Sequence, residues 1–246
     1  MTLDDPRFWL LAAVVVGAYS AEAATGFGAT VIAVSLGVHL FPLEVLLPVI
    51  VPLGVVLSAT IAWRERAHTD RRLLLRRILP LMGAGLVGGL AIFESASNAA
   101  LQRAFGSFVV VVAAAELWRG RSGALASAPL PPVAGGAALV GAGVVHGLFS
   151  TGGPLLVWAL GRAPIAKRVF RATLSTTWLT LGTALSLAYA LRGRLDGASL
   201  AATAALLPAL GLAWLAGDWL HHRLDETRFR RVIYALLLAA GLANLL

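Results

Sequence analysis

The chain has 246 residues, of which 59% are hydrophobic and 13% are charged. A soluble domain carries about 25% charged residues because its surface must face water, so this composition excludes a water-soluble globular fold. The net charge of +8 could suggest nucleic-acid binding. The basic residues, however, gather in short connections between apolar runs, as topology signals of membrane proteins do, so no nucleic-acid partner is expected. Without cysteine, disulfides and Cys-ligated metals are excluded.

The first apolar region, residues 8–40, is interrupted in its middle by Ala-Thr-Gly-Phe-Gly at 24–28. The chain begins Met-Thr-Leu-Asp-Asp, which is not the basic start of a signal peptide, so this region is expected to stay in the mature protein. A second broken region, 133–161, contains Ser-Thr-Gly-Gly-Pro at 150–154. Six further runs approach the roughly 20 residues that a membrane-spanning helix needs. They are 43–63, 73–93, 98–118, 169–191, 198–220 and 229–246.

Short motifs recur in the same order in the two halves of the chain. Thr25-Gly26 matches Thr151-Gly152, and Leu79-Pro80 matches Leu207-Pro208 at nearly the same offset. Arg103, before an apolar run, matches Arg230. We therefore predict two membrane repeats, 1–126 and 127–246, which together form one compact transmembrane domain.

The loop charges predict how the repeats are oriented. Connections rich in arginine or lysine lie near 64–77, 119–121, 162–171 and 223–231, and all are expected on the cytoplasmic side. They fall on one side only if each broken region is a hairpin that enters and leaves on the same side. The sequence thus predicts an all-α polytopic protein of the plasma (inner) membrane with two inverted repeats, each a broken hairpin followed by three transmembrane helices. Both termini are placed on the non-cytoplasmic side.

The two breaks are predicted to bind an anion. In each hairpin the second arm begins just after the break, so its free N–H groups and the positive end of its dipole point toward the membrane centre. Hydroxyls flank the glycines, which let the backbone approach a ligand. The predicted substrate-binding residues of the breaks are Thr25, Gly26, Phe27, Gly28, Ser150, Thr151, Gly152 and Gly153. The alternative is that these glycines serve only helix packing.

Other polar residues within apolar runs extend this site. Thr176 and Trp178 lie on the polar helix 169–191, which suits a pathway wall, although its hydroxyls could instead bond their own helix. Glu22 and His146 each lie about one turn before a break and are candidates for coupling or gating, as is Arg171 at the cytoplasmic mouth. Glu22 and His146 could instead satisfy backbone freed by the breaks. Neither a metal-binding constellation nor a nucleotide loop is present in the sequence, so no metal site, cofactor or catalytic residue is expected.

The motifs Ala-Thr-Gly-Phe-Gly-Ala at 24–29 and His-Gly-Leu-Phe-Ser-Thr-Gly-Gly-Pro-Leu-Leu at 146–156 resemble the paired signatures of the TauE/SafE sulfite exporter family of membrane anion transporters. The first motif departs from the family's frequent glycine run at Ala29 and Thr30. The resemblance implies a secondary transporter, an exporter of sulfite, sulfonates or related organic oxyanions, that works by alternating access. An anion channel and a membrane-embedded enzyme using His146 and Ser150 are the alternatives. Expected partners are a small anion, a coupling proton or cation, the lipid bilayer and a second copy in a homodimer.

Overall fold

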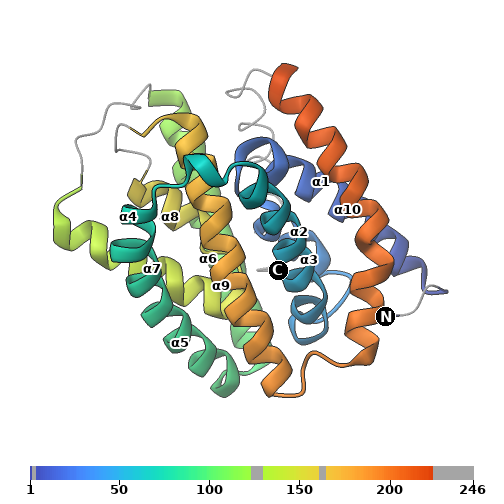
Figure 1. Ribbon diagram of the computed structural model, residues 1–246. Coiled ribbons are helices and arrows are strands. Elements are labelled where there is room, and N and C mark those ends of the chain that lie inside the picture. The colour runs from blue at the N-terminus through green and yellow to red at the C-terminus, as the bar shows by residue number, and fades with distance from the viewer. Residues whose placement is uncertain (2–3, 123–129, 161–164, 224–246) are drawn as a thin grey trace.

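A computed structural model describes residue 1 and residues 4–122, 130–160 and 165–223, and this part of the chain is helical without any strand (Figure 1). The predicted all-helical class is therefore confirmed. The elements are α1 (Pro6–Thr25), α2 (Ala29–Gly37), α3 (Leu43–Arg64), the 3₁₀ turn η1 (Arg66–His68), α4 (Arg71–Leu73), the π turn η2 (Leu74–Ile78), α5 (Leu79–Ser95), α6 (Asn98–Ser122), α7 (Pro132–Phe149), α8 (Gly153–Leu160), α9 (Lys167–Leu191) and α10 (Gly197–Arg223).

Five of the six uninterrupted apolar runs form long helices with ends within a few residues of the predicted ones, namely α3, η2 with α5, α6, α9 and α10. The sixth, 229–246, lies outside the described residues. In the described part, six helical segments are long and apolar enough to cross a membrane. Large apolar side chains such as Val87, Val111 and Leu212 are exposed on helices, as expected for surfaces that face lipid. The chain is a multi-pass membrane protein.

Both predicted breaks are present. Helix α1 ends at Thr25 and is capped by Gly26, and α2 begins after Gly28. Both glycines have the left-handed backbone that favours this residue type (φ 89° and 106°). Helix α7 ends at Ser150, which adopts a left-handed φ of 56° despite its side chain. The offset between the linkers 26–28 and 150–152 is thus 124 residues. This is two fewer than the offset between the Thr-Gly motifs Thr25-Gly26 and Thr151-Gly152.

The helices pair across the two predicted repeats. Helix α1 packs mainly on α10, α7 mainly on α5, and α3 on α9. The crossing of α5 and α7 is so close that a side chain at Gly89 or Gly143 would collide with the backbone of the other helix, at Val144 and Met82 respectively. Small residues permit such contacts between membrane helices.

Helix α3 carries Pro48 and Pro52 in its interior, where each proline removes a backbone hydrogen bond. Side chains from neighbouring helices bond nearby carbonyl groups. The Tyr19 hydroxyl donates to the Ile50 carbonyl at 2.7 Å, and the Thr203 hydroxyl donates to the Val49 carbonyl at 3.0 Å. These bonds tie α1 and α10 to α3 beside its prolines.

The described connections separate by charge between the two ends of the helix bundle. The arginine-rich connection from α3 to α5 and the beginning of α9 lie together at the top of Figure 1, whereas the end of α5 and the connection from α9 to α10 lie at the bottom. This arrangement agrees with the grouping expected from the loop charges.

Candidate functional site

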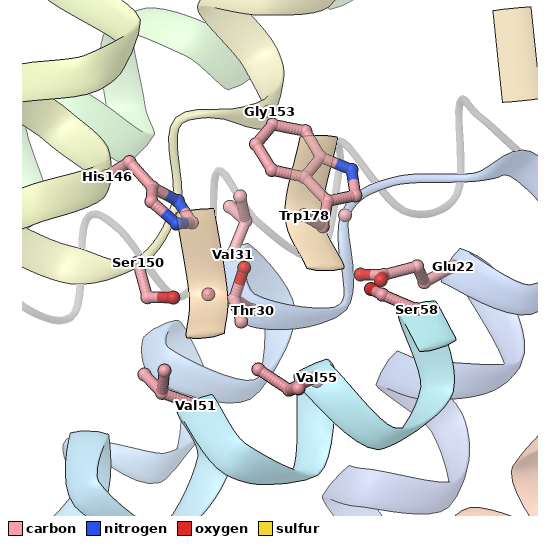
Figure 2. Close-up of a pocket in the computed structure, with 13 residues that line it drawn as sticks. Glu22, Thr30, Val31, Val51, Val55, Ser58, His146, Ser150, Gly153 and Trp178 are labelled. Atoms are coloured by element: carbon pink, nitrogen blue, oxygen red, sulfur yellow. The ribbon is translucent and has the colours of Figure 1, made fainter. Parts of the chain in front are cut away.

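A pocket lies where the two breaks meet α3 and α9 (Figure 2). Its lining combines the end of α1, the beginnings of α2 and α8, and the end of α7. Six of the predicted site residues line it: Glu22, Gly28, His146, Ser150, Gly153 and Trp178. The remaining lining residues are Thr30, Val31, Val51, Gly54, Val55, Ser58 and Gly182.

On the side of the first break, the pocket contains a buried carboxylate. Glu22 is 6% exposed, and its Oε2 accepts a hydrogen bond from the amide of Ala29 at 3.1 Å. Ala29 is the first residue of α2. The carboxylate therefore caps the N-terminus of α2, where the helix dipole favours a negative charge. One of the two helix ends predicted to bind the substrate thus already holds an acidic group of the protein.

On the side of the second break, hydrogen-bonding groups are left without protein partners. His146 is 3% exposed, and neither ring nitrogen has a hydrogen-bond partner in the described protein. Its ring stacks on Trp178 with 5.5 Å between ring centroids, which fixes the orientation of both rings. The Ser150 side chain and Gly153, the first residue of α8, line the pocket beside this ring. Because buried polar groups are normally paired, the unpartnered His146 ring fits a ligand that accepts a hydrogen bond.

The other residues of the first break hold the chain in shape. The Thr25 hydroxyl bonds the carbonyls of Ala21 and Phe27, at 2.8 and 2.9 Å. The Gly26 carbonyl accepts a hydrogen bond from Trp178 Nε1 at 3.1 Å. A Cβ added at Gly153 would lie 3.7 Å from Phe27 and from Trp178, in ordinary contact range. Thr25, Gly26 and Phe27 therefore lie beside the pocket rather than in its lining.

Two residues of the second break also lie behind the pocket. Gly152 packs so closely against the Ala142 carbonyl that a side chain would collide with it. Thr151 is 1% exposed, and its hydroxyl has no hydrogen-bond partner within the described chain.

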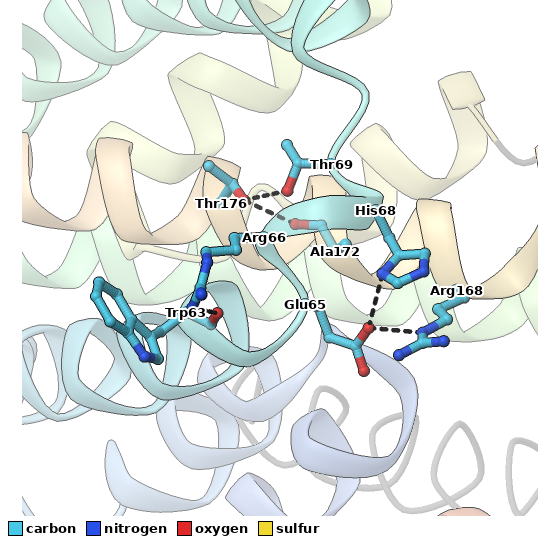
Figure 3. Close-up of polar contacts among 8 residues, drawn as sticks. All are labelled: Trp63, Glu65, Arg66, His68, Thr69, Arg168, Ala172 and Thr176. Atoms are coloured by element: carbon cyan, nitrogen blue, oxygen red, sulfur yellow. Dashed lines mark hydrogen bonds and ion pairs between the residues drawn. The ribbon is translucent and has the colours of Figure 1, made fainter.

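Thr176 and Arg171 lie between the pocket and the arginine-rich end. Arg171 donates from Nη2 to the Ala23 carbonyl at 2.7 Å and so covers the first break. Thr176 lies 3.1 Å, oxygen to oxygen, from the Thr69 hydroxyl in the connection after α3 (Figure 3). The same connection pairs Glu65 with Arg168 at 2.8 Å. These contacts tie the beginning of α9 to the first half of the chain.

At the opposite end, α9 is tied to the first half again. Arg192, just after α9, forms an ion pair with Glu94 near the end of α5, and the Arg194 guanidinium lies over the Phe93 ring, 4.9 Å from its centroid. Both ends of α9 therefore contact the first half through charged groups, while its middle lines the pocket.

The sequence interpretation missed the contribution of α3 to the pocket. Val51, Gly54, Val55 and Ser58 are an apolar and small-residue wall that no motif marks. One signal existed: Gly54 and Ser58 recur as Gly182 and Ser186 at an offset of 128, close to the offset of the other repeats. In the described residues, no group of three or more His, Asp or Glu side chains could hold a metal ion.

Comparisons with known proteins identify the family of the chain. The family model "Sulfite exporter TauE/SafE" matches residues 10–244. A probable sulfite/organosulfonate exporter TauE from Cupriavidus necator is 27% identical, with 98% of this chain and 94% of that protein aligned. No solved structure matches significantly. The family is one of exporters and not of enzymes. The chain belongs to the sulfite exporter TauE/SafE family of membrane transporters.

Proposed function

We propose that the chain is a secondary transporter that exports small sulfur oxyanions, such as sulfite or short organic sulfonates, across the plasma (inner) membrane. The name of the relative, a probable sulfite/organosulfonate exporter, supports this substrate class. The single observation that carries the proposal is that both ring nitrogens of the buried His146, which lines the pocket beside Ser150 and Gly153, have no hydrogen-bond partner in the described protein. An oxyanion has several acceptor oxygens and would accept a hydrogen bond from this ring.

The proposal gives some of the predicted substrate-binding residues other roles. His146 and Ser150 bind the anion, and Trp178 holds the His146 ring in place. Gly28 and Gly153 leave room for the anion at the two breaks. Thr25, Gly26, Phe27, Thr151 and Gly152 keep the breaks in shape, whereas Arg171 and Thr176 act in gating near the cytoplasmic end.

Alternating access would follow from two inverted repeats. Helices α1 and α7 hold equivalent places in the two predicted repeats, and so do α10 and α5. Each first helix therefore packs on the equivalent helix of the other repeat, α1 on α10 and α7 on α5, as two related halves would. The recurrence of Gly54 and Ser58 as Gly182 and Ser186 supports the duplication. In this mechanism α9 moves against α3, and the ion pairs Glu65–Arg168 and Glu94–Arg192 close opposite ends of the pathway. In this proposal the arginine-rich end faces the cytoplasm and both termini lie on the non-cytoplasmic side; the C-terminus lies outside the described residues.

Transport into proteoliposomes tests the proposal. We expect uptake of radiolabelled sulfite or ethanesulfonate to saturate with concentration and to be lost when Gly153→Leu fills the pocket. Gly83→Leu is the matched control, because a side chain at Gly83 has no neighbour in contact range. Flux that rises linearly with concentration would indicate an anion channel instead. Failure of every sulfur oxyanion to bind or move would refute the substrate class.

A further inference from the structure

The pocket that is proposed to bind an anion also contains a carboxylate. Glu22 is buried, and its carboxylate accepts a hydrogen bond from the Ala29 amide. No basic side chain of the described residues forms an ion pair with it. Two negative charges in one low-dielectric pocket repel strongly. Either the anion or the carboxylate charge must therefore be compensated when the pocket fills.

The groups around Glu22 do not supply this compensation. Tyr19, on the same helix, uses its hydroxyl on the Ile50 carbonyl. Arg171, on α9, donates to the Ala23 carbonyl. His146, on α7, lines the pocket from the second break and lies across from Glu22 in Figure 2. Asp218, on α10, adds a further negative charge to the helices packed on α1.

We infer that Glu22 takes up one proton when the anion binds, so that anion and proton share the pocket and cross the membrane together. The proton comes from the aqueous side on which the anion enters and forms an O–H bond on the free carboxylate oxygen. It leaves to the opposite solution with the anion. The Ala29 amide stays on Oε2 throughout. This inference rests on the proposed function and deepens it by naming the coupled species.

A proton fits the site better than a metal cation. Hard cations take about six oxygen ligands. Besides Glu22, the lining side chains on α2 and α3 offer only the hydroxyls of Thr30 and Ser58, among valines and a glycine. The Ser58 hydroxyl is 1% exposed and has no hydrogen-bond partner in the described protein, so it is available to a protonated carboxyl. A proton needs no further ligand.

Proton uptake on binding tests this directly. Ethanesulfonate is the probe because it keeps a single charge across the neutral pH range, unlike sulfite. Calorimetric titration of the purified full chain in buffers of different ionisation enthalpy measures protons taken up per sulfonate bound. We expect uptake near one proton for the wild type in alkaline buffers, where its Kd rises about tenfold per pH unit. Glu22→Gln, whose amide oxygen still accepts from Ala29, should bind sulfonate without proton uptake and without that pH dependence.

Glu44→Gln is the matched control, since Glu44 is exposed in the first turn of α3, and it should behave as the wild type. Binding without proton uptake between about pH 5 and about pH 9 would overturn the inference. Equal uptake in Glu22→Gln, or affinity that depends on Na⁺ rather than pH, would also overturn it. Absence of sulfonate binding in the wild type would instead count against the proposed substrate. The two failures are therefore distinguishable.

Discussion

Trp178 Nε1 donates a hydrogen bond to the Gly26 carbonyl at 3.1 Å, and this bond joins the middle of α9 to the first helix break. The same indole stacks on His146 beside the second break. One side chain thus contacts both breaks. A movement of α9 at this residue would therefore act on both breaks.

The Trp178 hydrogen bond can be removed while the aromatic ring is kept. Trp178→Phe preserves a ring next to His146 but leaves the Gly26 carbonyl without its donor. A lost buried hydrogen bond costs about 1 kcal/mol, so we expect the melting temperature of the detergent-solubilised protein to fall by about 2–4 °C. Trp63→Phe near the end of α3 is the control, since Trp63 is 72% exposed. Equal melting temperatures for wild type and Trp178→Phe would show that the bond does not stabilise the break.

The His146 ring nitrogens are predicted to bind the substrate. His146→Phe keeps the stacking on Trp178 and removes both nitrogens. Loss of one hydrogen bond to a charged group costs about 1.5–3 kcal/mol, so the Kd for ethanesulfonate should rise at least tenfold. His39→Phe at the exposed end of the first hairpin should leave the Kd unchanged. An unchanged Kd in His146→Phe would remove this residue from the site.

The close packing of α5 on α7 predicts that two glycines of α7 differ in how well they tolerate an added methyl group. An added methyl group at Gly143 would collide with the backbone at Met82, whereas at Gly136 it would only touch Leu81 at 3.9 Å. We expect Gly143→Ala to lose about 1–3 kcal/mol of stability through overpacking. Gly136→Ala should be neutral or slightly stabilising because alanine favours the helix. Thermal unfolding of both variants makes the comparison, and equal stability would contradict the close crossing.

We expect the ion pair between Glu65 and Arg168 to affect the transport rate more than the thermal stability of the protein. Arg168 is 64% exposed, and exposed pairs contribute only about 0–1 kcal/mol. Arg168→Ala should therefore leave the melting temperature within about 1–2 °C of the wild type. If opening of this end limits transport, a barrier lowered by about 1 kcal/mol raises the rate about fivefold. Transport rates in proteoliposomes measure this, and the difference should shrink at high salt.

An unchanged transport rate in Arg168→Ala at low salt would show that opening of this end does not limit transport. Thr176→Val, which removes the adjacent link to Thr69, should change the rate in the same direction.

Asp196 gives a pH dependence outside the membrane. It accepts from the backbone amide of Ser199 at the start of α10, and this hydrogen bond lowers the pKa of the carboxyl. Because the pKa is lowered in the folded protein, the charged cap stabilises the fold fully at pH values above the ordinary pKa of an aspartate. This stabilisation is lost as the pH falls through the lowered pKa. Asp196→Asn keeps the cap without a charge. It should lower the melting temperature near neutral pH and reduce the loss of stability on acidification.

The helices could be predicted from the sequence wherever an apolar run was long enough to span a membrane. Runs such as Leu43–Arg64 became helices because a span in lipid must satisfy all its backbone groups internally. The breaks were predictable because Gly26 and Gly28 have the freedom that a left-handed backbone needs. Ser150 at the end of α7 was not expected as the left-handed residue, since a serine rarely adopts this backbone.

The site was predictable only in part. Glu22 and His146 stood out because ionisable groups in apolar runs are rare. Ser58 and Val55 did not, because their place in the pocket depends on how α3 packs against both breaks. Thr25 looked like a ligand from its position, yet its hydroxyl bonds carbonyls of its own segment. Sequence spacing places a side chain on a helix but does not show which acceptor it bonds.

In the described part of the chain, neither arginine nor lysine lines the pocket, although the protein carries 20 such residues. A fixed cation beside an anion would bond it strongly and slow its departure. Neutral donors hold it more loosely. An exporter that must empty its pocket in every cycle benefits from this weakness. For the proposed exporter, this pocket composition favours rapid turnover over the scavenging of traces.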